Sequence, residues 1–390
     1  MSGSPLSGAI AIAGIGETGG GHHPERSSVQ LHAEVTAAAA DDAGVSLADV
    51  DCFVTANSRV QPFLYHAEMI AEYLGMAPAH CLTLNTSGST SAAILQYAAG
   101  MLLTGQAKYV LIAKADNLAT GMSRTATVES MATIGHPQYE APSGPLIPAL
   151  YALLAARYMH ETPITSEQIA LAAVTDRKWA ELNPAAQYRS PLSVDDVLGS
   201  KMIADPLHLL DCAPISDAGA AILVTTSERA RDLRRSPVSL LGIGETHDFE
   251  HVSQAPDLGR TGAASSGETA FAMAEVDRPD IDVAMVYDAF SFIQPMQLED
   301  LGFCGRGEGG EFIASGATAP GGLLPTNTHG GVLSHSHAGK SSSLLQFTEA
   351  VAQLRGDCGE RQVADAELAL VHTEGGILAS HCTAILGRDR

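Results

Sequence analysis

The stretch Ala9-Ile-Ala-Ile-Ala-Gly14-Ile-Gly-Glu-Thr18 returns later in this 390-residue chain as Ser239-Leu-Leu-Gly242-Ile-Gly-Glu-Thr246. Each copy is a short apolar run that leads into the same Gly-Ile-Gly-Glu-Thr sequence, which predicts a buried strand followed by a common turn. A repeat of this kind indicates two halves of similar plan. The charge-rich segment Thr225–Pro237 separates the copies. We therefore expect an N-terminal half, residues 1–235, which carries a loop insertion, and a C-terminal half, residues 236–390.

Both halves alternate apolar runs with helical patterns. In the first half a helix over Ser91–Leu103 precedes a strand at Tyr109–Ala113, and another strand covers Ala220–Val224. In the second half the expected strands are Val283–Val286, Glu367–Val371 and His381–Leu386. Strands that alternate with helices predict a layered α/β fold.

Composition limits the classes of function. The formal net charge of −22 argues against a general affinity for nucleic acid or anionic membranes, because phosphate binding depends on Lys and Arg. The six cysteines contain no Cys-x-x-Cys pair, so we expect neither a disulfide framework nor a zinc site. No segment reaches the roughly 18 uninterrupted apolar residues of a membrane span, and no signal peptide is recognisable. We expect a cytoplasmic protein with reduced thiols.

The first copy of the repeat also matches a dinucleotide-binding fingerprint, Gly14-x-Gly16-x-x-Gly19. The second copy has His247 in place of the third glycine. The residues after the first copy, His22-His23-Pro24, do not open a helix whose N-terminus holds a pyrophosphate. We therefore expect no bound nicotinamide or flavin cofactor.

A second informative stretch, Asn327–Gly339, contains three histidines, an asparagine and paired glycines. Glycines let the backbone approach a ligand closely, while His and Asn supply hydrogen-bond donors and a titratable proton. This composition predicts an active-site loop. The alternative is a polar surface turn that leads into the apolar helix Leu344–Leu354.

This loop and the segment Val286-Tyr-Asp-Ala-Phe290 together resemble the thiolase superfamily. Within it, the sterol-carrier-protein-x-like, or lipid-transfer-protein-like, branch is also suggested by short motifs along the chain. They are Arg157-Tyr-Met-His160, Asn183-Pro184, Ala204-Asp-Pro206, Asp211-Cys212, Ser216-Asp-Ala-Gly219, Leu298-Glu-Asp-Leu-Gly-Phe303 and Gly307-Glu-Gly-Gly310. The resemblance covers essentially the whole chain. It implies two βαβα repeats in an αβαβα arrangement, an active site between the halves and a homodimer.

The resemblance also assigns site residues. His337 falls on the family's histidine, which activates the nucleophile and helps to form an oxyanion hole, and Tyr287 falls on a position that supports that hole. The candidate catalytic residues are His337, Tyr287, His335 and Asp288. The candidate substrate-binding residues are Asn327, Gly330, Gly331, Gly88, Ser89, Gly375 and Gly376.

The chain departs from the family at both cysteines. Gly88 stands at the position of the nucleophilic cysteine, and the second cysteine, in a Cys-x-Gly-Gly motif, is replaced within His372–Gly376. Only a thiolate carries an acyl group readily near neutral pH, so a stable acyl-enzyme is not expected. Ser87, Ser89 or Ser91 could substitute, but no Gly-x-Ser-x-Gly elbow surrounds them and serine is common at helix N-termini.

Oxyanion stabilisation without a nucleophile fits retro-aldol cleavage of a β-hydroxyacyl-CoA, which forms an enolate and needs a base but no acyl-enzyme. The base would be Tyr287, with His335 or Asp288. A Schiff base on Lys340 is an alternative to a solvated helix start. The resemblance implies coenzyme A thioesters of steroid or lipid side chains as substrates.

Two other functions stay open on the sequence. The chain could be a catalytically silent acyl-CoA-binding subunit, or an acyltransferase with an unconventional nucleophile. The resemblance also implies a small companion subunit with an OB-fold and a zinc ribbon, which would supply basic groups that this acidic chain lacks.

Overall fold

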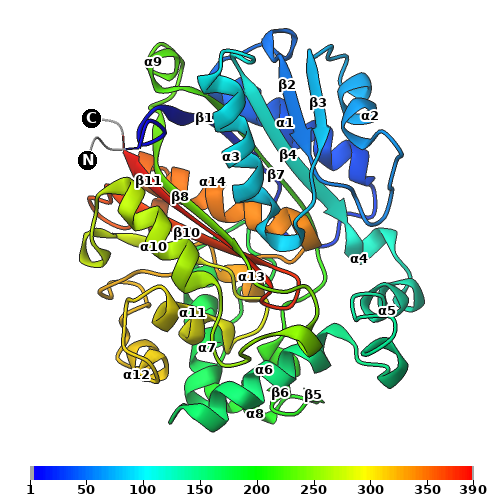
Figure 1. The fold of residues 1–390 in the computed structure, drawn as a ribbon, viewed down its shortest axis with the longest axis vertical. Helices are drawn as coiled ribbons and strands as arrows, with labels where there is room; N and C mark the ends of the chain where they lie inside the picture. Colours follow the sequence, from blue (N-terminus) through cyan, green and yellow to red (C-terminus); the bar gives the residue numbers. More distant parts are fainter. Residues whose placement is uncertain (1–3, 389–390) are drawn as a thin grey trace.

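A nine-stranded mixed sheet runs through the computed structural model, which describes residues 4–388 (Figure 1). Its strand order is β3-β2-β4-β7-β1-β8-β11-β10-β9. The strands are β1 (Ile10–Glu17), β2 (Cys52–Thr55), β3 (His80–Thr83), β4 (Val110–Asn117), β7 (Asp217–Thr226), β8 (Val238–His247), β9 (Val283–Val286), β10 (Leu368–Gly375) and β11 (Ser380–Arg388). The five strands that the sequence predicted after the first copy of the repeat are confirmed as β4, β7, β9, β10 and β11.

The two copies of the repeat meet at the middle of this sheet. Strands β1 and β8 pair antiparallel, with Ala11 opposite Ser239 and Ile12 opposite Val238. Each half of the chain therefore continues the sheet in its own direction from this junction. The sheet begins its second half at Val238, close to the predicted boundary, and the division into two halves at residues 235 and 236 stays a prediction.

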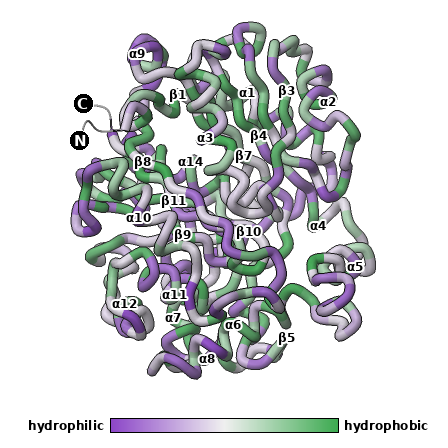
Figure 2. Tube along the Cα trace, viewed as in Figure 1, coloured by the Kyte–Doolittle hydropathy of each residue, from purple (hydrophilic) through white to green (hydrophobic). Residues whose placement is uncertain are grey.

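Four helices complete the layers. Helices α3 (Thr90–Leu103) and α14 (Ser342–Arg355) contact strands of both halves and lie between them, while α1 (Ser28–Ala43) covers the outer face of the first half and α10 (Ala263–Ala274) that of the second (Figure 1). The αβαβα thiolase-like arrangement is thus confirmed. Because α3 is covered on both sides, its sequence is apolar nearly all round, and the central strands are largely hydrophobic (Figure 2).

The glycines of the repeat have a packing role. A Cβ atom at Gly14 would overlap the carbonyl oxygen of Ala39 in α1, and one at Gly242 would overlap that of Ala270 in α10. The predicted turn at Gly-Ile-Gly-Glu-Thr is wrong, because these residues continue β1 and β8. Close helix-on-strand packing, and not a bent backbone, requires glycine there.

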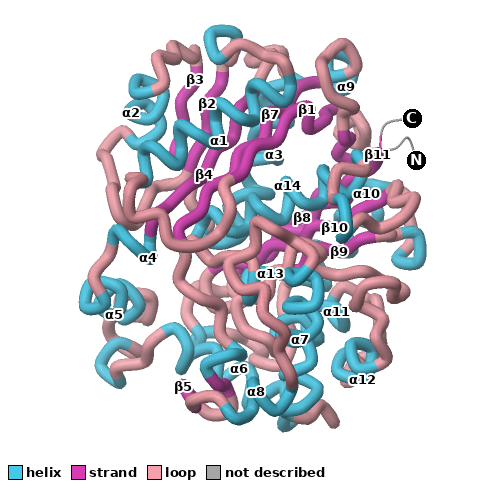
Figure 3. The backbone as a smooth tube through the Cα atoms, turned by 180° about the vertical axis from the view of Figure 1, so that it is seen from behind, coloured by secondary structure: helices cyan, strands magenta, loops and turns pink. Residues whose placement is uncertain are grey.

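The insertion in the first half lies across the second half. It comprises α4 (Leu118–Gly121), α5 (Arg124–Ala132), α6 (Ile147–Glu161), α7 (Ser166–Glu181), α8 (Val194–Gly199) and the hairpin β5 (Met202–Ala204) with β6 (Leu207–His208). Its helix α7 packs on α11 (Ile293–Asp300), α12 (Gly309–Ala314) and α13 (Gly331–Ser334), below the sheet in Figure 3. The insertion thereby covers one end of the layered core.

The charge-rich junction between the two copies of the repeat is only partly helical. Only Ser227–Ala230 forms a helix, α9, at the rim of the molecule. Among residues 4–388, no helix combines the length and the apolar character that crossing a bilayer requires.

A buried lysine joins the two central helices. Lys114 in β4 donates hydrogen bonds from Nζ to Ser91 Oγ in α3 at 2.7 Å and to Ser343 Oγ in α14 at 3.0 Å. The two hydroxyl oxygens are themselves 2.8 Å apart. Burial, with a smaller effect of Lys340, lowers the pKa of Lys114 well below its ordinary value. The first turns of α3 and α14 are therefore fixed to a single nitrogen atom.

A buried ion pair holds the middle of α14. Arg361 Nη2 lies 2.9 Å from Glu349 Oε2, and Glu349 also accepts a hydrogen bond from Thr328 Oγ1 at 2.7 Å. Thr328 belongs to the histidine-rich loop, so Glu349 connects this loop to α14 and to the segment that precedes β10.

We predict that Arg361→Met lowers the free energy of unfolding by about 3 kcal/mol or more, because it leaves the Glu349 carboxylate buried without its cation. The matched control is Arg26→Met, which removes a guanidinium paired with Glu34 at the surface. That change should cost about 1 kcal/mol or less. Urea unfolding followed by circular dichroism measures both, and equal costs would contradict the role of the buried pair.

Candidate active site

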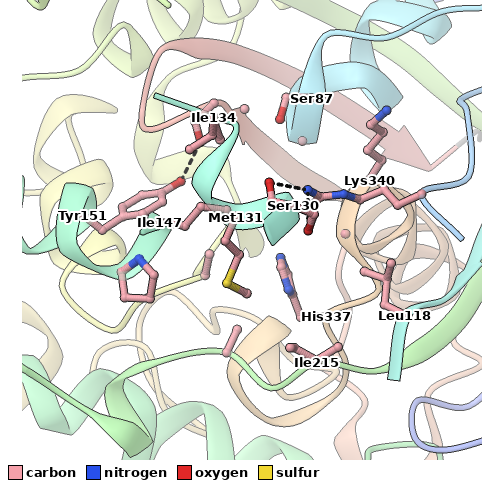
Figure 4. Close-up of a pocket in the computed structure, with 18 of the residues that line it drawn as sticks. Ser87, Leu118, Ser130, Met131, Ile134, Ile147, Tyr151, Ile215, His337 and Lys340 are labelled. Atoms are coloured by element: carbon pink, nitrogen blue, oxygen red, sulfur yellow. Dashed lines mark hydrogen bonds between the residues drawn. The ribbon is translucent and has the colours of Figure 1, made fainter. Parts of the chain in front are cut away.

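A cavity of about 390 Å³ opens where the two halves and the insertion meet. The first half contributes the turn before α3, the second half contributes the turn before α14 and the ends of β9 and β10, and the insertion supplies an apolar wall (Figure 4). The apolar wall includes Leu118, Met122, Met131, Ile134, Ile147 and Ile215. An apolar cavity with a few convergent polar groups is typical of a site for a small organic ligand.

Tyr287 and His337 form a hydrogen-bonded pair on the cavity wall. Tyr287 Oη lies 3.0 Å from His337 Nε2, and the main chain at His337 is held by two hydrogen bonds with Ser216. Burial lowers the pKa of His337 to about 4, with a smaller contribution from Arg59. Burial, followed by Glu374 and Asp288, raises the pKa of Tyr287 well above its ordinary value. At neutral pH both groups are uncharged, so the pair can accept one proton.

The other two predicted catalytic residues lie away from the cavity wall. Asp288 is fully buried and accepts hydrogen bonds from Val332 N at 2.8 Å and Leu333 N at 3.1 Å, at the start of α13. His335 is buried against His329, with 5.0 Å between ring centroids, and its Nδ1 lies 2.9 Å from Ser336 Oγ. Their positions do not fit direct proton transfer, because both side chains point into the protein beneath the loop.

The glycines and the asparagine of this loop shape its backbone. Asn327 Oδ1 accepts a hydrogen bond from Val286 N at 2.8 Å. A Cβ atom at Gly331 would overlap the Asp288 carboxylate, and one at Gly330 would lie 2.7 Å from Ala180 Cβ. Both glycines have positive φ, at 111° and 66°. Asn327, Gly330 and Gly331, predicted to bind substrate, therefore lie behind the cavity wall and hold the loop.

The turn before α3 has no room for a nucleophile at Gly88. A Cβ atom there would overlap the carbonyl oxygen of Glu374 in β10, so a cysteine would displace the backbone. Ser89 points away from the wall, with its Oγ 2.6 Å from Ser380 Oγ. Ser87 lies on the wall with φ of 57°, but no hydrogen bond joins its Oγ to a base within residues 4–388. An unactivated serine hydroxyl is a weak nucleophile.

The one cysteine on the cavity wall in the described part of the chain is Cys212. Burial, with a smaller effect of Asp211, raises the pKa of Cys212 to about 12. Its thiol is therefore protonated at neutral pH and is not poised to attack a thioester.

The sequence interpretation missed one titratable pair, Tyr151 and Glu374. Tyr151 Oη in α6 lies 2.9 Å from Glu374 Oε1 and 3.0 Å from the carbonyl oxygen of Gly376. Burial raises the pKa of Glu374 to about 8, partly offset by the Tyr151 hydrogen bond. An acidic residue at the end of a buried strand, directly before two glycines, was the available signal. Those glycines, Gly375 and Gly376, line the cavity as predicted for substrate contacts.

Two cations also face the cavity. Arg59 donates a hydrogen bond from Nη2 to Ser130 Oγ at 3.2 Å, and Lys340 is half-buried in the turn before α14 (Figure 4). Lys340 is less solvated than the sequence predicted, because it is half-buried on the cavity wall. Burial, with Arg59 as a second cause, lowers the pKa of Lys340. The cavity thus offers positive charge within a strongly acidic chain.

Similar proteins identify the family. A profile described as thiolase C-terminal domain-like matches residues 244–388. The steroid side-chain-cleaving aldolase of Thermomonospora curvata is 34% identical over 99% of this chain and 100% of its own. The 17-hydroxy-3-oxo-4-pregnene-20-carboxyl-CoA lyase of Mycobacterium tuberculosis is 35% identical over 96% and 98%. The acetyl-CoA acetyltransferase of Methanothermobacter thermautotrophicus is 31% identical over 97% and 99%.

Solved structures of thiolase-like proteins have the same fold as this chain. The structure named Ltp2-ChsH2(DUF35) aldolase superposes with a TM-score of 0.87 at 34% identity, over 99% of both chains. The named relatives with at least 30% identity are lyases or acyltransferases. The chain is therefore a thiolase-like enzyme, a member of the thiolase superfamily in the branch of the sterol-carrier-protein and lipid-transfer-protein thiolases, close to the steroid side-chain aldolases.

Proposed function

We propose that this enzyme cleaves a β-hydroxyacyl-CoA by a retro-aldol reaction that forms no acyl-enzyme. One observation carries the proposal: the turn at Gly88 excludes a nucleophile while the neutral Tyr287–His337 pair faces the same cavity. The aldolase and the lyase similar to this chain support the same reaction class. The coenzyme A thioester is a substrate, and no bound cofactor takes part.

The reaction begins at the β-hydroxyl group. Its proton moves to Tyr287 Oη as the phenolic proton moves to His337 Nε2. The bond between the α- and β-carbons breaks, the β-carbon leaves as a ketone or aldehyde, and the electron pair forms a thioester enolate. Backbone N–H groups of the turn at residues 87–91, at the positive end of α3, stabilise the enolate oxygen.

The cavity wall also supports a class of substrate. Its long apolar side supplies the contacts for a bulky apolar group, such as the side chain and adjoining ring of a steroid or another lipid. Arg59 and Lys340 favour binding of the negatively charged coenzyme A part of the substrate. Asp288 and His335 act in this proposal through the loop that they hold, and not on the substrate.

A second candidate function is acyl transfer from Ser87. The positive φ of Ser87 and its place on the cavity wall favour this function, as does the acetyltransferase among the relatives. The missing base beside Ser87 Oγ, within the described residues, favours the aldolase. A silent acyl-CoA-binding subunit would have no use for the Tyr287–His337 pair.

We also propose a cytoplasmic homodimer that recruits a small companion with an OB-fold and a zinc ribbon. The similar structure pairs Ltp2 with ChsH2(DUF35) in its name, which supports a partner of this kind. The acidic character of this chain supports a basic partner surface for the phosphates of coenzyme A.

The first prediction from this proposed function is that no acyl-enzyme accumulates. Incubation with acyl-CoA should leave the intact mass of the protein unchanged, because neither Ser87 nor Cys212 is activated. Ser87→Ala should keep the cleavage rate of the parent enzyme. A stable adduct on Ser87 or on a cysteine in the mass spectrum would favour acyl transfer.

The second prediction concerns the proton-transfer pair. Tyr287→Phe should slow ketone or aldehyde release from a β-hydroxyacyl-CoA by about a hundredfold or more, because it removes only the hydroxyl that transfers the proton. His337→Ala should abolish release while the protein stays folded. Tyr188→Phe, at an exposed position outside the cavity, is the matched control. Full activity of Tyr287→Phe would move the base to another residue.

The third prediction concerns assembly. Light scattering after size-exclusion chromatography should give the mass of two chains, and co-expression with genomic neighbours should recover a small basic partner that raises activity. A lone chain with full activity that is undiminished on dilution would contradict both parts.

A further inference from the structure

Retro-aldol cleavage involves two proton transfers. One proton leaves the β-hydroxyl, and another must reach the α-carbon before the enolate becomes the acyl-CoA product. The Tyr287–His337 pair holds the first proton when the carbon–carbon bond breaks, so a different group has to supply the second. This group must lie on the same cavity wall and carry a proton at neutral pH.

Glu374 meets the first requirement. Glu374 lines the cavity together with Tyr287 and His337, yet only 1% of it is exposed. Its Oε2 atom is buried and has no hydrogen-bond partner among residues 4–388, and within that range no basic side chain forms an ion pair with it. A buried carboxylate without a cation is costly, so the environment favours the protonated acid.

The contacts of Tyr151 can also accommodate the protonated acid. The phenol has one proton, but its oxygen lies within hydrogen-bond distance of both Glu374 Oε1 and the carbonyl oxygen of Gly376. The carbonyl can only accept. When Tyr151 donates to Gly376, a protonated Glu374 completes the arrangement by donating to Tyr151. Tyr151 is therefore a positioning residue that orients the carboxyl group.

We propose that Glu374 is a second catalytic residue, the acid that protonates the α-carbon of the enolate. The inference rests on the proposed function. In the cleavage direction the enolate electron pair takes the carboxyl proton, a C–H bond forms and Glu374 becomes a carboxylate. Exchange with water returns a proton to Glu374 and removes one from His337. In reverse, the carboxylate removes a proton from the α-carbon of an acyl-CoA.

The pH dependence follows from the surroundings of Glu374. Tyr151 and Tyr287 act on it directly, and the other titratable or charged groups of the cavity wall are His337, Cys212, Arg59 and Lys340. Burial raises the pKa of Glu374 to about 8. The acid needed for cleavage is present below that pH and is lost above it. The carboxylate needed to remove an α-proton appears as pH rises through the same range.

The test uses the intact protein and two assays. One follows exchange of the α-hydrogens of propanoyl-CoA with D2O by mass spectrometry, and the other follows ketone or aldehyde release from β-hydroxyacyl-CoA thioesters. Glu374→Gln should slow exchange by about a hundredfold or more and remove its rise with pH. Glu374→Asp should restore part of the exchange with its pH dependence. Glu268→Gln, an exposed carboxylate on α10, is the matched control and should behave as the parent.

The outcomes separate this inference from the proposed function. Exchange by Glu374→Gln at the parent rate and with the parent pH profile would overturn the role of Glu374 while cleavage stands. Exchange that depends on Glu374 without release from any β-hydroxyacyl-CoA would overturn the retro-aldol proposal and keep the acid. If the parent enzyme shows neither exchange nor release, both the role of Glu374 and the retro-aldol proposal are overturned. Thermal unfolding of each variant confirms that it is folded, and Glu374→Asp remains the test if the glutamine variant is not.

Discussion

The site depends on the contact between Gly88 and the carbonyl oxygen of Glu374, which leaves no space for a Cβ atom. It presses the turn before α3, from one half of the chain, onto β10 from the other half. The cavity floor is therefore made of main chain. The titratable side chains come from the elements around this floor, as two phenol-containing pairs, Tyr287 with His337 and Tyr151 with Glu374.

In the proposed reaction these two pairs divide the acid–base work, and burial is the main cause of the division. Removing a group from water disfavours its charged form, so an imidazole loses affinity for its proton while a carboxyl group keeps it. His337 and Glu374 thus stay neutral over a wide range around pH 7, one able to accept a proton and the other able to give one. The family's thiols are not needed for this arrangement, and Gly88 would not accommodate the first of them.

Much of the fold could be predicted from the sequence because apolar periodicity is local. The strand at Val283–Val286 and the helix at Leu344–Leu354 follow from their own residues, and the repeat at Gly14 and Gly242 places the two halves. The repeat also predicted a turn where the strand continues. In a sequence, a glycine required by a closely packed helix cannot be distinguished from a glycine required by a turn. Only the packed structure distinguishes the two causes.

The site was harder for a related reason. His335 and His337 are two residues apart in one loop, yet only His337 faces the cavity, and the direction of each side chain depends on contacts with Ser216 and His329. Asp288 is a residue type that can act as a base, but its carboxylate accepts hydrogen bonds from the first backbone N–H groups of α13, as a helix cap does. The sequence signal at Glu374 was an acidic residue before two glycines, and its burial, which gives that residue its chemistry, is seen only in the structure.

The positive charge around the cavity has a further consequence. Lys340 and Arg59 lie on the cavity wall, whereas the chain as a whole carries a charge of −22. Within about a Debye length of the surface, an incoming polyanion is therefore repelled by the net negative charge of the chain, and it is attracted only close to the cavity. Added salt weakens the long-range repulsion more than the short-range attraction. Moderate salt should therefore speed the binding of an anionic ligand to the isolated chain, because counterions lower the repulsive barrier around it.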